Sequence, residues 1–258
     1  MSKHWFLAAA LAALFVPALA AHRAPVAHKT PAYVSAALAD AGRSDADRQT
    51  DALRKPADMI AFAGIRPGSR VMDVMPGPGY FTRIFAKAVG DKGYVYAFVP
   101  SEQLVEIVKR FPNADVAKQF AAYPNVSVLQ APIGKLFAPE PLDVVWIAQN
   151  YHDWHDKFMG PADVAVVNKA VYDVLKPGGV YVIVDHAAKD GSGLTATETL
   201  HRIDEAAVKQ EVEAAGFKFV GESSVLRNSQ DPRDKLIFDP AIRHHTDQFV
   251  LKFVKPRH

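Results

Sequence analysis

Two hydrophobic patterns alternate along most of the chain. Short apolar runs rich in β-branched and aromatic residues are typical of buried strands, and apolar residues recurring every three or four positions are typical of helices. The strand-like runs are RVMDVM, YVYAFV, NVSVLQ, LDVVWIA and GVYVIVD, which begin at residues 70, 94, 125, 142 and 179. Helical spacing occurs between them, most clearly at residues 81–88 and 164–174. Apolar strands alternating with amphipathic helices predict a mostly parallel sheet with helices on both faces.

The pattern changes after a last helical segment at residues 204–216. Two further strand-like runs, FKFVGESSV and TDQFVLKFVK, follow without a helix between them, so we expect them to be antiparallel neighbours. The loop between them, residues 226–245, is long for a compact domain, which indicates a functional or a mobile segment. We therefore predict one Rossmann-like α/β domain over residues 56–258, with a seven-stranded, mostly parallel sheet and an antiparallel C-terminal strand.

Residues 1–20 have the pattern of a cleavable signal peptide. Lys3 is followed by an apolar run at residues 5–16, and Ala18-Leu19-Ala20 has the small-x-small pattern of a signal peptidase site. The run is shorter than the ~20 residues of a membrane-spanning helix, so an uncleaved anchor is the weaker interpretation. We expect a periplasmic or secreted protein that begins near Ala21 and keeps no stable membrane anchor.

Residues 21–55 are expected to form a helical extension in front of the α/β domain. The segments PAYVSAALADAG and SDADRQTDALRK are rich in alanine and in polar helix formers. Pro56 suits the first turn of the next helix, and Gly64 suits its C-terminal end.

Charge and composition narrow the classes of partner. The chain has 30 basic side chains, one of them Lys3 in the leader, against 28 acidic ones. This near balance gives no electrostatic reason to expect a nucleic-acid partner. The absence of cysteine excludes disulfides, thiol catalysis and cysteine-ligated metals. A small-molecule substrate is the partner that we expect, and the sequence does not indicate an oligomeric state.

The sequence VMDVMPGPGY, residues 71–80, joins the first strand of the predicted sheet to a helix. Gly77 and Gly79 allow positive φ angles and close approach of a ligand to the backbone, and free amides at a helix start favour polar or anionic groups. Asp73 lies inside the strand, where a carboxylate is costly to bury without a partner. A lone Gly-x-Gly fits an ordinary strand-to-helix turn equally well, so both interpretations stay open.

Several stretches together resemble class I S-adenosylmethionine-dependent methyltransferases over about residues 56–256. VMDVMPGPG resembles the first motif of that family, LKPGGVYVIVD the junction before its fifth strand, IAQNYHDW the loop after its fourth strand, and the last helix and two strands its antiparallel ending. More narrowly, RKPADMIAFAGIRPG, NYHDWHD, LHRIDEAAVKQEVEAAGF and FDPAIRHHTDQFVLKF resemble an exported group of predicted methyltransferases.

This resemblance implies S-adenosylmethionine as the cofactor. A carboxylate suits the ammonium group of that cofactor, and bare glycine backbone suits its bulk. The cofactor-binding residues that we expect are Asp73, Gly77, Gly79, Tyr80, Glu102 and Asn150.

Three places depart from the pattern of the family. Met75 replaces the first glycine, Val99 and Pro100 stand where an acid usually binds the ribose, and Ala131 and Pro132 stand where an acid usually meets the adenine. Glu102 either substitutes for the ribose acid or complements the dipole of a helix that Ser101 caps.

The stretch NYHDWHD, residues 150–156, should lie at the carboxyl edge of the sheet, where α/β folds bind their ligands. Methyl transfer needs positioning and often a base, so His152 is the expected catalytic base, with Asp153 beside it. A structural histidine packed under the sheet edge is an equally good interpretation of His152. His152 and His155, with His186 as a third ligand, suit a metal only weakly, so we expect none.

Three functions follow, from the strongest to the weakest. The first is methylation of an unknown small molecule with S-adenosylmethionine. The second, which the leader and the missing acids favour, is an exported, non-catalytic ligand-binding protein on a degenerate methyltransferase fold. The third is a metal-assisted hydrolase built on His152, His155 and His186.

Overall fold

The computed structural model describes residues 30–113, 115–160 and 162–257. The predicted signal peptide lies outside the described residues, so it stays a prediction. The predicted helical extension contains α1 (Ala32–Leu38) and α2 (Asp45–Arg54), and α3 (Pro56–Ala63) follows at once. Helix α3 has proline in its first turn and ends at Gly64, whose φ of 72° is favourable for glycine.

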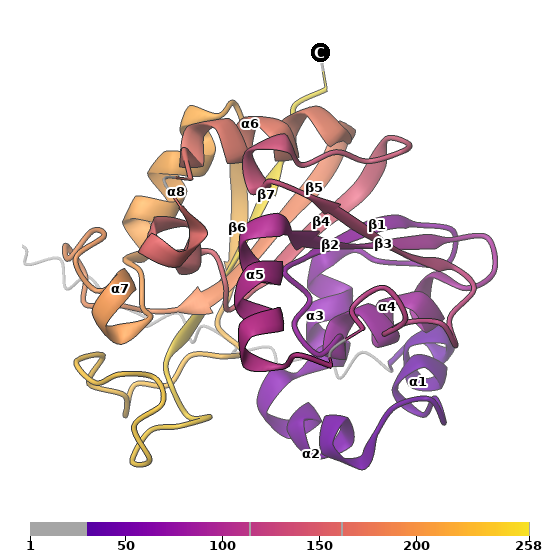
Figure 1. Ribbon diagram of the computed structural model, residues 1–258, viewed down its shortest axis with the longest axis horizontal. Helices are drawn as coiled ribbons and strands as arrows, with labels where there is room; N and C mark the ends of the chain where they lie inside the picture. Colours follow the sequence, from indigo (N-terminus) through magenta and orange to yellow (C-terminus); the bar gives the residue numbers. More distant parts are fainter. Residues whose placement is uncertain (1–29, 114, 161, 258) are drawn as a thin grey trace, which may run out of the picture.

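One seven-stranded sheet organises the chain, in the order β3-β2-β1-β4-β5-β7-β6 (Figure 1). The strands are β1 (Arg70–Val74), β2 (Tyr94–Pro100), β3 (Val126–Ala131), β4 (Leu142–Ala148), β5 (Leu175–His186), β6 (Lys218–Ser223) and β7 (Gln248–Val254). Strands β1 to β5 pair in parallel, whereas β7 pairs antiparallel with both β5 and β6. The predicted fold class is therefore confirmed, including the antiparallel ending.

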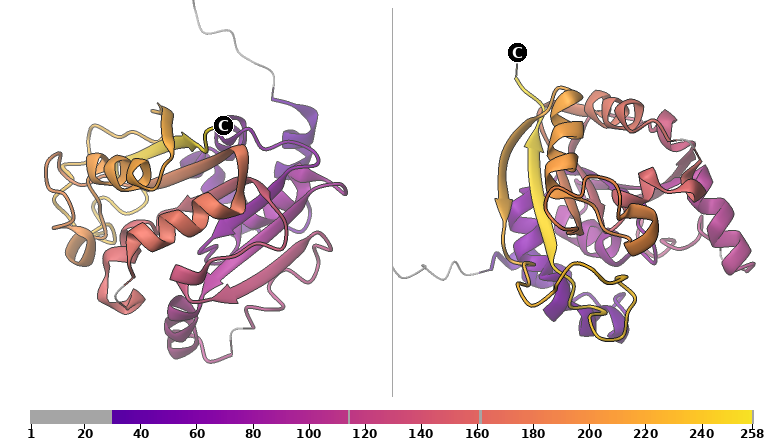
Figure 2. Two further views of the ribbon diagram at one scale, coloured as in Figure 1. Left: turned by 90° about the horizontal axis from the view of Figure 1, so that it is seen from above. Right: turned by 90° about the vertical axis from the view of Figure 1, so that its left-hand side faces the viewer.

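Helices cover both faces of this sheet (Figure 2). One apolar core packs α6 (Val164–Val174) and α8 (Glu205–Ala214) against strand residues such as Met72 and Val74. A second core packs α1, α3 and α4 (Tyr80–Val89) against the alternate strand residues, such as Val71 and Trp146. Because successive side chains of a strand point to opposite faces, continuous apolar runs are what a sheet buried on both sides requires.

Side chains define where several helices begin. Ser44, Asp163 and Asp204 accept hydrogen bonds from backbone amides in the first turns of α2, α6 and α8. Helix α5 (Ser101–Arg110) differs from the expectation, because it begins at Ser101 itself, after Pro100, and has no side-chain cap. The sequence of α5 has the apolar spacing of an amphipathic helix, yet none of its residues is fully buried.

The loop between β6 and β7, residues 224–247, is held by buried charges. Arg202 donates hydrogen bonds to both carboxylate oxygens of Asp231, at 2.8 and 3.1 Å, and both side chains are fully buried. The amide of Asp247 also donates to Asp231, at 2.7 Å. This loop and α2 lie at the same end of the molecule, below the sheet in Figure 1.

Four short helical segments were not predicted. These are the 3₁₀ turns η1 (Ile133–Lys135), η2 (His152–His155) and η3 (Lys157–Met159), and one turn of helix, α7 (Thr197–Leu200), which precedes α8. Such short turns carry no periodic signal in a sequence. In the described part of the chain, no helix has the length and apolar character needed to span a bilayer.

Candidate functional site

The order of the strands places a crevice between β1 and β4. Chain connections run from β1 toward β2 and β3 on one side and from β4 toward β5 on the other, so the direction reverses between β1 and β4. Ligands of open α/β sheets bind outside the carboxyl ends of the strands at such a reversal. Residues 75–79 follow β1 at this point, and residues 149–153 follow β4.

A cavity of about 480 Å³ occupies this crevice. Five of its lining residues are among the predicted site residues, namely Asp73, Gly77, Asn150, His152 and Asp153. Arg54, Met75, Gln149, His186 and His201 also line it, as do Phe158, Ile237 and Phe238. Two stretches that are about 75 residues apart in sequence, VMDVMPGPG and NYHDWHD, therefore share one cavity.

Asp73 is the acid at the β1 end of the cavity and is only 3% exposed. Thr82, on α4, donates a hydrogen bond from its hydroxyl to the Asp73 carboxylate at 2.5 Å. Burial raises the pKa of Asp73 to about 7, although the bond from Thr82 and the charge of Arg54 oppose the rise. These partners do not offset the cost of burial, so a cationic ligand beside the Asp73 carboxylate would stabilise its charge.

Arg54 is a cavity residue that the sequence analysis missed. It is the last residue of α2, and its guanidinium donates a hydrogen bond to the Gln149 side chain at the end of β4. The guanidinium lies 4.9 Å from the ring centroid of Tyr80 and 5.4 Å from that of Phe81. An arginine at the end of an exposed, polar helix has no sequence signal that distinguishes it from a solvated one.

The turn after β1 keeps the backbone of a glycine-rich loop. Gly77 and Gly79 have φ angles of 55° and 82°. A Cβ atom on Gly79 would lie 2.3 Å from the Phe120 ring, so glycine is required there. Met75 also has a positive φ, 56°, and its side chain is buried. The residue that replaces the first glycine of the motif thus adopts the left-handed conformation in which glycine is unstrained.

Tyr80 and Glu102 are not brought into this cavity. The Tyr80 hydroxyl donates a hydrogen bond to Asp51 at 2.7 Å, and its ring lines a neighbouring cavity of about 540 Å³ instead. The Glu102 carboxylate accepts from the amide of Ile133, at 3.2 and 3.3 Å, and so connects α5 to η1. Gly79 shapes the turn but does not line the cavity of Asp73.

His152, at the β4 end, is held from behind by Asp185 at the end of β5. Its Nδ1 lies 2.8 Å from one Asp185 oxygen, and its backbone amide donates to the other, also at 2.8 Å. Burial alone would lower the pKa of His152, but the Asp185 charge and hydrogen bonding by Asp153 raise it to about 10. An imidazole with that pKa keeps its proton at neutral pH. The geometry therefore does not favour the predicted role of His152 as a general base.

The free edge of the His152 ring faces Asp153 and His201. Its Nε2 lies 3.2 Å from Asp153 Oδ1 and 3.3 Å from His201 Nδ1. Burial opposes ionisation of Asp153, but hydrogen bonds to His152 and His201 hold the pKa of its carboxyl well below the usual range. Asn150 donates to the second Asp153 oxygen at 2.8 Å. His201, which follows α7, was not predicted as a site residue.

The histidines proposed for a hydrolase are not assembled. His155 turns toward Glu211 on α8, at 3.3 Å, and its ring does not line the cavity. His186 Nδ1 lies 2.8 Å from the Thr246 hydroxyl, and burial lowers the pKa of His186 to about 3. Of the predicted trio only His152 belongs to the group of potential metal ligands in the described chain, which joins it to Asp153, Asp156 and His201.

Comparison with known proteins agrees with this geometry. A family model described as "Methyltransferase domain" matches residues 72–183, the segment from β1 to β5 that builds the crevice. One curated relative is the ubiquinone/menaquinone biosynthesis C-methyltransferase UbiE of Teredinibacter turnerae, 27% identical over 197 residues, 75% of this chain and 67% of the relative. This relative is a UbiE-type enzyme, so the comparison does not support the exported group that the sequence analysis expected.

Solved structures share the fold at low sequence identity. A SAM-dependent methyltransferase from Aquifex aeolicus superposes with a TM-score of 0.55 and 19% identity, over 80% of this chain and 93% of that one. A Burkholderia thailandensis 1,6-didemethyltoxoflavin-N1-methyltransferase with bound S-adenosylhomocysteine superposes with a TM-score of 0.51 and 19% identity. The match covers 83% of this chain and 82% of that one. The chain therefore has the Rossmann-like fold of class I methyltransferases, a family whose methyl donor is S-adenosylmethionine, and its residues 72–183 match the methyltransferase domain.

Proposed function

We propose that this protein methylates a small molecule with S-adenosylmethionine bound in the cavity between β1 and β4. One observation carries the proposal: Asp73 and Arg54, of opposite charge, line the same cavity at the point where the sheet connections reverse. The amino-acid end of the cofactor carries an ammonium and a carboxylate, and these two side chains match both charges.

The residues around the turn fit the remaining demands of this cofactor. When bound, S-adenosylmethionine supplies an electrophilic methyl group on a positively charged sulfur. In our proposal the Asp73 carboxylate binds the ammonium, and the Arg54 guanidinium binds the carboxylate. Gly77 leaves its backbone open to the ligand, because nothing lies within 4 Å of where its Cβ would be.

The acceptor would occupy the β4 end of the cavity. This end combines the aromatic rings of Phe158 and Phe238 with the polar edges of His152 and Asp153. Such a surface suits a small aromatic ring that carries oxygen substituents, which is consistent with the quinone pathway named for the Teredinibacter relative. His152 and Asp153 would bind that oxygen and so position the ring near the methyl group.

The affinity for the cofactor tests the proposal. Titration calorimetry of residues 21–258 with S-adenosylmethionine and S-adenosylhomocysteine should detect binding. Asp73→Ala and Arg54→Ala should each weaken it about tenfold or more, since each removes one charged partner. Arg66→Ala, which removes an exposed arginine, is the matched control and should bind normally. Absence of heat from a folded wild-type protein would overturn the assignment.

A non-catalytic ligand-binding protein is the second candidate, favoured by the missing ribose and adenine acids at residues 99–100 and 131–132. It predicts binding without transfer, so incubation with methyl-labelled cofactor and hydroxylated aromatic acceptors separates the two. A labelled product supports the enzyme, and bound cofactor with no product from any acceptor supports the binding protein.

Export is proposed on the leader alone. Full-length protein produced in a Gram-negative host should appear in the periplasmic or extracellular fraction, with a mature N-terminus near Ala21. Intact protein that keeps Met1 and remains with the cytoplasmic fraction would contradict export.

A further inference from the structure

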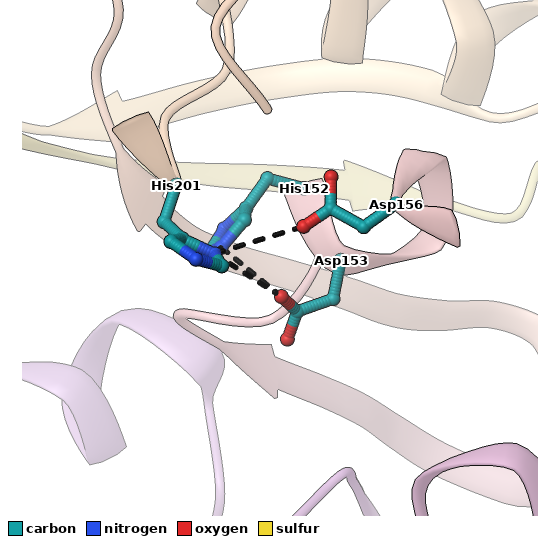
Figure 3. A group of neighbouring side chains, drawn as sticks. All are labelled: His152, Asp153, Asp156 and His201. Carbon is teal, nitrogen blue, oxygen red and sulfur yellow. Dashed lines mark hydrogen bonds and ion pairs between the residues drawn. The ribbon is translucent and has the colours of Figure 1, made fainter. Parts of the chain in front are cut away.

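Four side chains converge at the β4 end of the cavity (Figure 3). His152, Asp153 and Asp156 come from η2 and the residue after it, and His201 reaches them from the residue after α7. One potential ligand atom from each lies within 4.8 Å of the other three. His201 Nδ1 is 3.6 Å from Asp156 Oδ2 and 3.8 Å from Asp153 Oδ1.

These separations suit a shared cation. Zinc binds imidazole nitrogen and carboxylate oxygen at about 2.0–2.2 Å, so the ligand atoms of a tetrahedral site lie roughly 3.3–3.5 Å apart. The distances from His152 Nε2, 3.2 Å to Asp153 and 3.3 Å to His201, match this spacing, and the His201–Asp156 distance of 3.6 Å is close to it.

The environment of His152 is that of a metal ligand. Its Nδ1 is occupied by the fully buried Asp185, which leaves Nε2 to face the other three side chains. Metal-binding histidines commonly use one ring nitrogen on the metal and donate the other N–H to a carboxylate, which fixes the tautomer and the ring orientation.

Asp156 supplies an independent observation. Its side chain is only 3% exposed, and its Oδ1 is buried without a hydrogen-bond partner. A buried carboxylate with an unpartnered oxygen is costly, and a cation bound at Oδ2, the oxygen that faces His201, would compensate the charge of this group.

The balance of charge also favours a cation. Asp153, Asp156 and Asp185 bring three carboxylates to two imidazoles, of which His152 carries one positive charge. No lysine or arginine among the described residues forms an ion pair with any of the three carboxylates. Buried charges are normally paired or bind metals.

We propose that a divalent transition-metal cation, Zn²⁺ in the first place, binds to His152, Asp153, Asp156 and His201. Two nitrogen and two oxygen donors suit zinc better than magnesium or calcium, which prefer oxygen ligands alone. His152, Asp153 and His201 line the cavity, so a bound cation would face the acceptor space. This proposal differs from the expectation of no metal, and it stands independently of methyl transfer.

Metal content and affinity test the site directly. Chain 21–258, freed of any tag, should be stripped with a chelator and titrated calorimetrically with ZnCl₂. We expect one Zn²⁺ per chain, bound at least about tenfold more weakly by His201→Ala and by Asp156→Asn. His155→Ala is the matched control, because His155 lies on the same turn but contacts Glu211, and it should bind as the wild type does.

Cobalt gives a second readout that a misfolded variant cannot imitate. Co²⁺ in a four-coordinate nitrogen and oxygen site should give visible absorption in the wild type and in His155→Ala, but not in His201→Ala. Circular dichroism of each variant establishes that it is folded. No binding to the folded wild type would overturn the proposal. Binding that is unchanged in both His201→Ala and Asp156→Asn would also overturn it and show an adventitious ion only.

Discussion

The two ends of the cavity each bury an aspartate, but the two carboxylates have different surroundings. Asp73 has hydrogen bonds from the hydroxyl and the backbone of one residue, Thr82, and lies near the charge of Arg54. Asp185 accepts from the His152 ring, the His152 amide and the His186 amide, all at 2.8 Å. A buried carboxylate with three nitrogen partners supports the local structure, whereas one whose partners do not offset its burial is available to a ligand.

The two ends of the cavity therefore differ in how firmly their polar side chains are held. At the β1 end, the Asp73 carboxylate can still accept a charged or hydrogen-bonding partner, as a site that exchanges a cofactor requires. The β4 end is rigidly built, because Asp185 orients His152 and His152 in turn faces Asp153 and His201. Pre-organised side chains lower the cost of positioning an acceptor or a metal.

The largest expected effect is on stability at the β4 end. Asp185→Ala removes the acceptor of three buried donors, so we expect the free energy of unfolding to fall by about 3–5 kcal/mol. Urea denaturation measures the change. The control is Asp173→Ala on the exposed side of α6, where the carboxylate is 58% exposed and pairs only with Lys169. That variant should change stability by less than about 0.5 kcal/mol. Equal losses in both variants would contradict the structural role of Asp185.

A smaller effect concerns stability and pH at the β1 end. The folded-state pKa of Asp73, about 7, lies above its unfolded value of 3.8, so the folded chain keeps a proton that the unfolded chain has lost. Stability from this group is therefore fully present below pH 4 and is lost as the pH rises through 7. Compared with Asp73→Asn, the wild type should lose roughly 2–4 kcal/mol between pH 4 and 8. Parallel stability curves for the two proteins would contradict the raised pKa.

The smallest effect concerns the affinity for the cofactor and pH. If the ionised Asp73 binds the ammonium group, S-adenosylmethionine should bind up to about tenfold more tightly at pH 8 than at pH 6, since the carboxylate ionises near pH 7. Calorimetric titrations at the two values measure the change. Asp73→Asn should bind weakly and equally at both, while the Arg66→Ala control should follow the wild type. A pH dependence that persists in Asp73→Asn would assign the titration to another group.

Much of the architecture could be predicted because periodicity reports burial. The five parallel strands, the antiparallel ending and the principal helices lie where the apolar patterns place them. The site was predicted less completely. Asp73 and His152 were found because each lies beside a strand end, where α/β folds bind ligands. Glu102 was placed near the cofactor by analogy, but its carboxylate binds the Ile133 amide.

The sequence by itself determined the order of the elements, the two-sided sheet and the glycine turn that follows Asp73, because these depend on local periodicity and backbone conformation. Only the tertiary structure decided which polar side chains meet. Arg54 reaches Gln149, 95 residues later, and His201 reaches back 49 residues to His152. His155 and His186 are instead held by Glu211 and Thr246. Such pairings depend on how aperiodic loops pack at the sheet edge, and the hydrophobic pattern carries no information about them.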